Sequence, residues 1–214
     1  CAFMKLSDYR TLAFDCDGVV LNSNQVKTQA FYEAALPYGE AKAQALVDYH
    51  KANGGISRYR KFDYFLTEMV PNEARGPSLD ELLERFARTV RGLLSQCEVA
   101  EGLFELREAT PHARWLLVSG GDQAELREVF AERGLTELFD GGIFGSPDTK
   151  DEILDREKRK GNAPIPILFI GDSRYDYEAA NRANCEFLFL SQWSEFEGFE
   201  EYFKNKSVNV SFSL

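Results

Sequence analysis

The chain has 214 residues, 44% of them apolar, which is enough for one α/β domain of ordinary size with a modest insertion. Its formal net charge of −10 argues against nucleic acid or an anionic membrane as a partner. No run of eighteen apolar residues occurs, and the first residues lack the basic-then-apolar pattern of a secretory signal. We therefore expect a cytoplasmic protein with no membrane-spanning helix.

Cysteine and histidine are sparse. The cysteines show neither C-x-x-C spacing nor a nearby histidine, so we expect free thiols rather than a zinc site or disulfides. The two histidines are expected to be structural or solvent-exposed. These residues are Cys1, Cys16, Cys97, Cys185, His50 and His112.

The chain begins with a short strand and continues with helices. Residues 9–14 (YRTLAF) read as a largely apolar strand that stops at a loop, 15–18. Asn22, Ser23 and Asn24 are N-cap candidates for the helix that follows. Four helices are expected in this stretch, ending at about 36, 52, 70 and 94.

The fourth of these helices, from Ser78 to about 94, has the clearest pattern. Its apolar residues recur at the i, i+3, i+4, i+7 spacing of a helix with one buried face. Ser78 is the expected N-cap, and Glu81 is placed for a capping box. The stripe consists of Leu79, Leu82, Leu83, Phe86, Val90, Leu93 and Leu94.

After Gly102 the pattern changes to strands alternating with helices, which implies a parallel sheet covered on both faces. We predict an α/β fold with a doubly wound parallel sheet. Residues 1–22 and 100–214 would form this core, and the helical stretch 23–99 would be an inserted domain. Strands are expected over 113–118, 142–144, 165–170, 186–190 and, at the edge, 208–212, with helices over 122–132, 150–160 and 175–183.

Polar motifs follow each of the first four expected strands. Ligands of open α/β sheets bind at the carboxyl ends of the strands, so the sheet would bring these motifs together. Each motif alone could be an ordinary turn or helix cap, but their repeated position favours a common site. They are Asp15-x-Asp17, Ser119, Lys150 and Asp172-x-x-x-Asp176.

The residue types suit phosphoryl transfer. Converging carboxylates repel one another unless a cation is present, and Mg²⁺ favours carboxylates together with water and substrate phosphate. A carboxylate can attack phosphorus, while a second carboxyl protonates the leaving oxygen and later activates water. A hydroxyl and a lysine can hold the phosphoryl oxygens.

The motifs resemble the four signatures of the haloacid dehalogenase superfamily, and they bracket nearly the whole chain. The helical insertion is similar to the α-helical cap of the phosphoglycolate phosphatase and β-phosphoglucomutase branch, whose core is a Rossmannoid sheet. The matching segments are 15–20 (DCDGVV), 117–120 (LVSG), Lys150 and 171–176 (GDSRYD).

The resemblance implies a role for each matched residue. Asp15 would be the nucleophile and a metal ligand. Asp17 would be the general acid and base, and its backbone carbonyl would help to bind Mg²⁺. Ser119, Gly120 and Lys150 would hold the phosphoryl group. The metal site would be completed by Asp172 as a direct ligand and Asp176 as a supporting carboxylate.

The expected function is a Mg²⁺-dependent phosphatase that hydrolyses a small phosphorylated metabolite through an aspartyl-phosphate. Sugar, polyol and small-acid phosphates all remain open as substrates. Superfamily members that act as dehalogenases or phosphonatases usually lack the second aspartate, Asp17. A phosphomutase keeps both aspartates and is the alternative, with a non-enzymatic regulatory module a distant third. The oligomeric state is left open.

Substrate recognition is expected in the helical insertion. The segment after Gly54-Gly55 offers cations in a helix start that could close over the site, and Arg58 is expected to read the leaving group. A solvated basic helix face is the other interpretation of this segment. The candidate substrate-binding residues are Arg58, Tyr59, Arg60 and Lys61.

Overall fold

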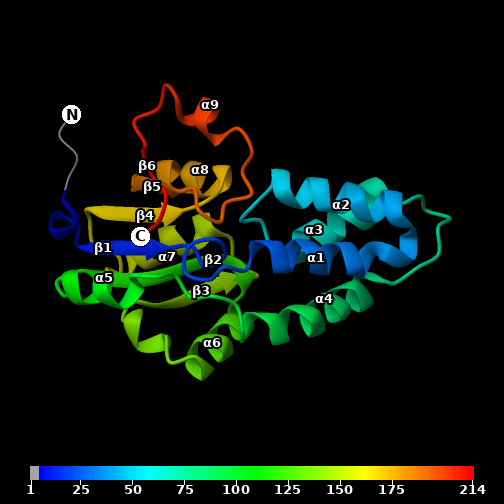
Figure 1. Ribbon diagram of the computed structural model, residues 1–214, viewed down its shortest axis with the longest axis horizontal. Helices are drawn as coiled ribbons and strands as arrows, with labels where there is room; N and C mark the ends of the chain where they lie inside the picture. Colours follow the sequence, from blue (N-terminus) through cyan, green and yellow to red (C-terminus); the bar gives the residue numbers. More distant parts are fainter. Residues whose placement is uncertain (1–4) are drawn as a thin grey trace.

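The computed structural model describes residues 5–214 and has a six-stranded parallel sheet, as the sequence predicts (Figure 1). The strand order is β3-β2-β1-β4-β5-β6, so the chain winds outward from β1 in both directions. The strands are β1 (Thr11–Phe14), β2 (Arg114–Asp122), β3 (Gly142–Ser146), β4 (Ile167–Gly171), β5 (Glu186–Leu190) and the expected edge strand β6 (Asn209–Ser211).

The central strand β1 is buried on both faces, because helices cover both sides of the sheet. Leu12 and Phe14 belong to one apolar cluster, and Ala13 between them belongs to a second cluster on the opposite face. The first face packs against α5 (Leu103–Ala109) and α6 (Gln123–Glu132). The second packs against α7 (Lys150–Arg159), α8 (Arg174–Arg182) and α9 (Phe199–Phe203). The short helices α5 and α9 were not expected from the sequence.

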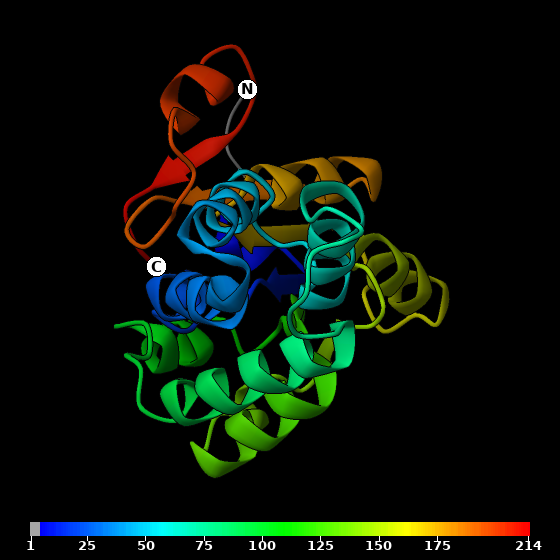
Figure 2. The same ribbon diagram turned by 90° about the vertical axis from the view of Figure 1, so that its right-hand side faces the viewer.

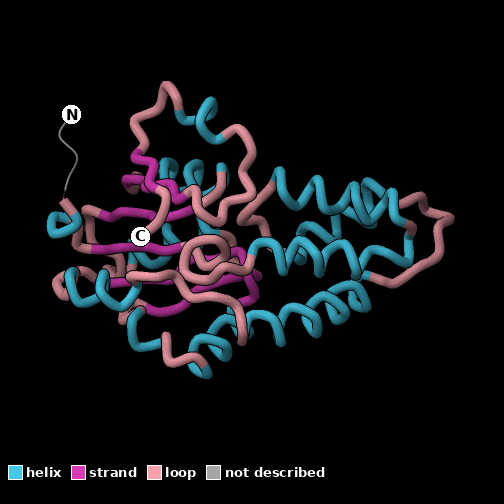
Figure 3. The backbone as a smooth tube through the Cα atoms, in the orientation of Figure 1, coloured by secondary structure: helices cyan, strands magenta, loops and turns pink. Residues whose placement is uncertain are grey.

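Four helices lie beyond the carboxyl ends of the strands and form a separate group without strands (Figure 3). Figure 2 looks onto these helices, with the sheet behind them. The third expected helix is α-helical only as far as Tyr64, after which residues Phe65–Met69 form wider π-helical turns. The four helices are α1 (Asn24–Ala35), α2 (Glu40–Ala52), α3 (Arg58–Tyr64) and α4 (Leu79–Leu94).

The N-terminus of α4 is capped as the sequence predicts, with one difference. The Ser78 hydroxyl accepts a hydrogen bond from the Glu81 N–H at 3.3 Å. The Glu81 carboxylate accepts from the same hydroxyl at 3.2 Å, which is a variation on the expected capping box. The predicted apolar stripe is buried at Leu82, Phe86, Val90 and Leu94, but Leu93 is exposed.

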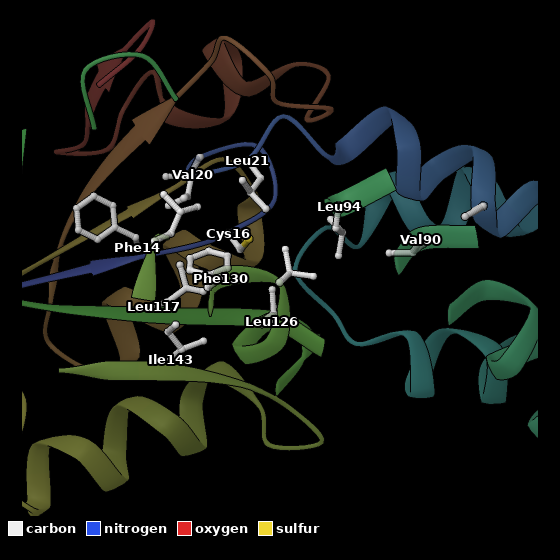
Figure 4. Packing of buried hydrophobic residues seen from close by; sticks show 14 of the residues in the cluster. Phe14, Cys16, Val20, Leu21, Val90, Leu94, Leu117, Leu126, Phe130 and Ile143 are labelled. Carbon is white, nitrogen blue, oxygen red and sulfur yellow. The ribbon is translucent and has the colours of Figure 1, made fainter. Parts of the chain in front are cut away.

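The main apolar cluster continues from the sheet into the helices (Figure 4). It joins residues of the strands, of α6 and of the loop after β1 to residues of α4. The helices therefore pack against the core rather than extending freely into solvent. Labelled members are Phe14, Cys16, Val20, Leu21, Val90, Leu94, Leu117, Leu126, Phe130 and Ile143.

Two further expectations, on the cysteines and on membrane-spanning helices, can be compared with the structure of residues 5–214. Cys16, Cys97 and Cys185 are free thiols, as predicted, while Cys1 lies outside the described residues. In this part of the chain no helix has the length and apolar character needed to cross a membrane.

Candidate active site

A cavity of about 500 Å³ opens where the carboxyl ends of the strands meet helices α1 to α3. One wall comes from the loops after β1 and β4 and from the end of β2. The other comes from the helices, and the loop after β5 adds Glu195, Phe196 and Glu197. Residues from the strand ends include Asp15, Asp17, Gly120 and Asp172, and residues from the helices include Lys27, Phe31, His50, Arg58 and Lys61.

Three carboxylates converge at one end of this cavity. Asp15, Asp172 and Asp176 are buried, and each offers an oxygen within 4.8 Å of the others. Burial and the Asp176 charge raise the pKa of Asp15 to about 7, against the partial relief given by Lys150. Burial and the charges of Asp15 and Asp176 raise the pKa of Asp172 well above its usual value. The cluster therefore lacks positive charge.

Lys150 lies behind the nucleophile candidate, at the first residue of α7. Its Nζ is 3.0 Å from Asp15 Oδ1 and also forms an ion pair with Asp176 Oδ1. The other oxygen of Asp176 accepts the Asp172 N–H at 3.1 Å. Both oxygens of Asp176 therefore have partners, through which it positions Lys150 and the Asp172 backbone.

The two oxygens of Asp15 have different surroundings. Oδ1 accepts the Cys16 N–H at 2.8 Å and faces Lys150. Within residues 5–214, Oδ2 receives no hydrogen bond, and Asp15 lines the cavity. Oδ2 is therefore the oxygen available to an incoming group.

Gly18 makes room for the carboxylate of Asp172. Its φ is +80°, and a Cβ there would lie 2.0 Å from Asp172 Oδ2. In that space, Asn24 Nδ2 donates to Asp172 Oδ2 at 2.7 Å and to the Trp193 carbonyl at 2.8 Å. Because Gly18 has no side chain, its backbone in the first motif can lie directly against the Asp172 carboxylate of the fourth motif.

Asp17 has a different environment from Asp15. The Ser23 hydroxyl donates to its Oδ1 at 2.5 Å, and Lys27 Nζ lies 2.8 Å from its Oδ2. Burial alone would raise the pKa of Asp17, but the Lys27 charge and these hydrogen bonds outweigh burial and lower it. Ser23 is at the N-cap position of α1, as expected, but its hydroxyl serves Asp17 instead of the helix.

The second motif lies on β2, which continues to Asp122, beyond its expected end at 118. The buried Ser119 hydroxyl accepts the Gly121 N–H at 3.0 Å, so it closes a local turn. Gly120 and Gly121 line the cavity. A Cβ on Gly120 would lie 2.2 Å from the Gly55 carbonyl oxygen, so the loop before α3 rests directly on the end of this strand.

The four residues expected to bind the substrate have different environments in the structure. Arg58 is buried, and both its terminal nitrogens contact Glu125 of α6, at 3.1 and 2.6 Å. The Tyr59 hydroxyl bonds to Asp122, and Arg60 is exposed. Arg58 lines the cavity, but its guanidinium already has a carboxylate partner, so its role in binding the leaving group stays a prediction. Of the four, Lys61 alone lines the cavity without forming an ion pair with a carboxylate in residues 5–214.

Several residues at the site were not predicted to belong to it, among them His50, which was expected to be structural or solvent-exposed. Lys27, Phe31 and His50 line the cavity, and Asn24 contacts Asp172. A usable signal exists for two of them. Lys27 falls three residues before Ala30, and His50 falls three and four residues after Val47 and Leu46, so each lies on the buried face of its helix. A charged or titratable residue on an apolar stripe needs a buried partner.

A family model for haloacid dehalogenase-like hydrolases matches residues 9–184, which hold all four motifs. The chain belongs to this family. No curated protein sequence matches the hydrolase.

Solved structures share its fold at low identity. A candidate phosphoglycolate phosphatase from Lactobacillus plantarum is 21% identical, with a TM-score of 0.70 and coverage of 96% of this chain and 95% of that one. CbbY from Rhodobacter sphaeroides, solved with phosphate, is 15% identical, with a TM-score of 0.70 and coverage of 96% and 94%. The hydrolase YfnB from Bacillus subtilis, solved with magnesium, is 18% identical, with a TM-score of 0.63 and coverage of 86% and 89%.

The carboxylate cluster of the hydrolase fits a hard divalent cation. Its donors are carboxylate oxygens, which Mg²⁺ prefers, and they are buried and close together. Their raised pKa values show that the full set of negative charges is costly without a cation. Asp15 and Asp172 would hold the ion, since both oxygens of Asp176 already have partners.

Magnesium should stabilise the folded hydrolase. At 100 times its Kd, an ion that binds only the native state adds about 2.7 kcal/mol, or about 5 °C in Tm for a chain of this size. Asp172→Asn removes a ligand and one of the repelling charges. We expect this variant to melt higher than the parent without metal and to lose the magnesium shift, as measured by calorimetry. An equal magnesium shift in both proteins would place the ion elsewhere.

The buried pair of Arg58 and Glu125 should contribute to stability. Arg58→Ala leaves the Glu125 charge buried and unpaired, so we expect a loss of about 3 kcal/mol in urea unfolding. Glu125→Ala should cost a similar amount, and the double variant should cost much less than the two losses together. Arg60→Ala, two residues along the same helix but exposed, is the control, with a change within about 0.5 kcal/mol. Unchanged stability of Arg58→Ala together with impaired turnover would return Arg58 to substrate recognition.

Proposed function

We propose that this hydrolase is a Mg²⁺-dependent phosphatase that hydrolyses a small phosphomonoester through a phosphorylated Asp15. The observation that carries the proposal is the placement of Asp15. Its Oδ2 is available at the cavity, its Oδ1 is held by Lys150 and the Cys16 N–H, and Asp17 lines the same cavity. The phosphate in CbbY and the magnesium in YfnB support the same chemistry in proteins of similar fold.

In the first step, Asp15 Oδ2 attacks phosphorus and the bond from phosphorus to the leaving oxygen breaks. Asp17 gives a proton to that oxygen, so the leaving group departs as an alcohol. Lys150, the Ser119 hydroxyl and the Gly120 N–H would hold the phosphoryl oxygens as charge shifts onto them. A bound Mg²⁺ would neutralise carboxylate and phosphoryl charge at this point.

In the second step, a water molecule attacks phosphorus while Asp17 takes its proton. The bond from phosphorus to Asp15 breaks, and inorganic phosphate and a free carboxylate result. Lys27 favours the ionised form of Asp17, because its ammonium group stabilises the carboxylate, so Asp17 must hold the proton that it gives in the first step against this effect. That carboxylate is the product of the first proton transfer and the base for the second.

Residues 23–99 would act as a cap over this chemistry. The Gly55 backbone rests against Gly120, and Arg58 and Tyr59 bond to residues of α6 and β2. These contacts place the helices over the strand ends. A covered site limits stray water around the reacting phosphoryl group.

The activity can be tested by measuring phosphate release from a broad panel of phosphomonoesters. We expect release from at least one small ester with magnesium and loss of that activity in excess chelator, restored by added magnesium. Full activity after complete metal removal would contradict the metal dependence. An isomerised sugar phosphate formed with little free phosphate would identify a phosphomutase instead.

Substitutions of the two aspartates of the first motif should affect turnover differently. Asp15→Asn removes the attacking oxygen and should abolish turnover. Asp17→Asn should slow turnover by roughly 10²–10⁴, because it removes the proton donor and base but leaves the nucleophile. With p-nitrophenyl phosphate, whose leaving group needs little protonation, this variant should still form the phosphoenzyme. Mass spectrometry of the trapped protein should find the phosphoryl group on Asp15, and its appearance on any other residue would refute the assignment.

A further inference from the structure

Three buried cations line the cavity, and their partners differ. Lys27 pairs with Asp17, and Arg58 pairs with Glu125. Lys61 is 2% exposed and forms no ion pair with any carboxylate in residues 5–214. A buried ammonium group without a counter-ion is costly, so proteins seldom keep one unless a ligand supplies the opposite charge.

A chain of hydrogen bonds fixes the position of this ammonium group. Lys61 Nζ lies 2.8 Å from His50 Nδ1, and His50 Nε2 lies 3.1 Å from the Thr28 hydroxyl. That hydroxyl lies 2.8 and 2.9 Å from the two carboxylate oxygens of Glu195, to which it donates its only proton. His50 must therefore donate from Nε2 and accept at Nδ1, so Lys61 donates to His50.

This arrangement holds the ammonium group without neutralising it. Burial and the charge of Lys61 lower the pKa of His50 well below its usual value, so the imidazole stays neutral. One proton of Lys61 is used on His50, which leaves two for another acceptor. The Phe31 ring, 5.5 Å from Nζ, provides a further apolar boundary. Burial and the charges of Lys27 and Lys150 lower the pKa of Lys61 to about 7, against the opposite effect of Asp17 and Glu195, so a bound anion would restore its charge.

We propose that Lys61 binds an acidic group on the leaving-group part of the substrate, either a carboxylate or a second phosphoryl group. Lys61 belongs to α3, on the helical wall of the cavity, whereas Asp15 belongs to the strand-end wall. The cavity of about 500 Å³ suits a small substrate that spans the two walls. The substrate class would then be phosphate esters of hydroxy acids or small bisphosphates. The phosphate-ester part of this inference rests on the proposed function.

Binding can be measured without turnover in Asp15→Asn protein with magnesium, by calorimetry on matched pairs of esters. 2-Phosphoglycolate is compared with 2-hydroxyethyl phosphate, which lacks the carboxylate. The bisphosphate of 1,3-propanediol is compared with 3-hydroxypropyl phosphate. We expect the acidic member of at least one pair to bind about 10- to 100-fold more tightly, as a desolvated charge-assisted hydrogen bond allows. The pair with the larger ratio identifies a carboxylate or a phosphoryl group as the ligand.

Adding Lys61→Met should reduce that ratio to near one. Lys51→Met is the matched control, because Lys51 is exposed at the edge of the same cavity and carries the same charge. It should change the ratio by less than about twofold. Lys61→Met should also melt no lower than its parent, since an apolar side chain replaces a buried unpaired charge. A misfolded variant would melt lower and is detected in this way.

The outcomes separate this inference from the proposed function. Equal binding of acidic and neutral esters, or a preference that survives Lys61→Met, would overturn the role of Lys61 even if the native enzyme releases phosphate. An acid preference that disappears with Lys61→Met would support it even if the native enzyme releases phosphate from no ester of the broad panel, in which case the proposed function would fail.

Discussion

The excess of negative charge at the carboxyl ends of β1 and β4 governs the rest of the site. Four aspartates meet there, at positions 15, 17, 172 and 176, and within residues 5–214 only Lys27 and Lys150 form ion pairs with them. With all four ionised, two negative charges remain uncompensated, which equals the charge of one divalent cation. Burial and this uncompensated negative charge raise the pKa values of Asp15 and Asp172.

The parallel sheet brings these negative charges together at one edge. Parallel strands end at the same edge of a sheet, so residues more than 150 positions apart become neighbours. Buried lysines then distinguish aspartates of the same chemical type. Lys27 lowers the pKa of Asp17, whereas Asp15 shares Lys150 with Asp176 and keeps a raised pKa. Two carboxylates two residues apart thereby acquire different protonation behaviour. Without a cation the shifts run opposite to the proposed roles, since a nucleophile must be ionised and a proton donor protonated, so a cation beside Asp15 would be needed to lower its pKa.

The sequence predicts the sheet and the convergence of the motifs, because hydrophobic periodicity and strand ends are local properties. It does not predict ion-pair partners, which depend on how elements pack. Arg58 and Lys61 are three residues apart in one short basic segment and look equivalent in the sequence. In the structure, Arg58 reaches Glu125 of α6, and Lys61 reaches His50 of α2. The same limit applies to Ser23, whose position at a helix start is predictable but whose hydrogen bond to Asp17 is not.

The two walls of the cavity would contact different parts of the substrate. The strand-end wall carries groups that any phosphomonoester would need, since they contact only the phosphoryl group and its metal. Selectivity must come from the helical wall, which touches the remainder of the substrate. There the chain satisfies Arg58 internally but, within residues 5–214, leaves the Lys61 amine hydrogen-bonded only to a neutral imidazole. Glu195 lies three hydrogen bonds away, through His50 and Thr28. A purely structural lysine would be more stable beside that carboxylate. Its separation from Glu195 by Thr28 and His50 keeps the Lys61 amine oriented and without an ion-pair partner in residues 5–214, which is the property that recognition of an anion requires.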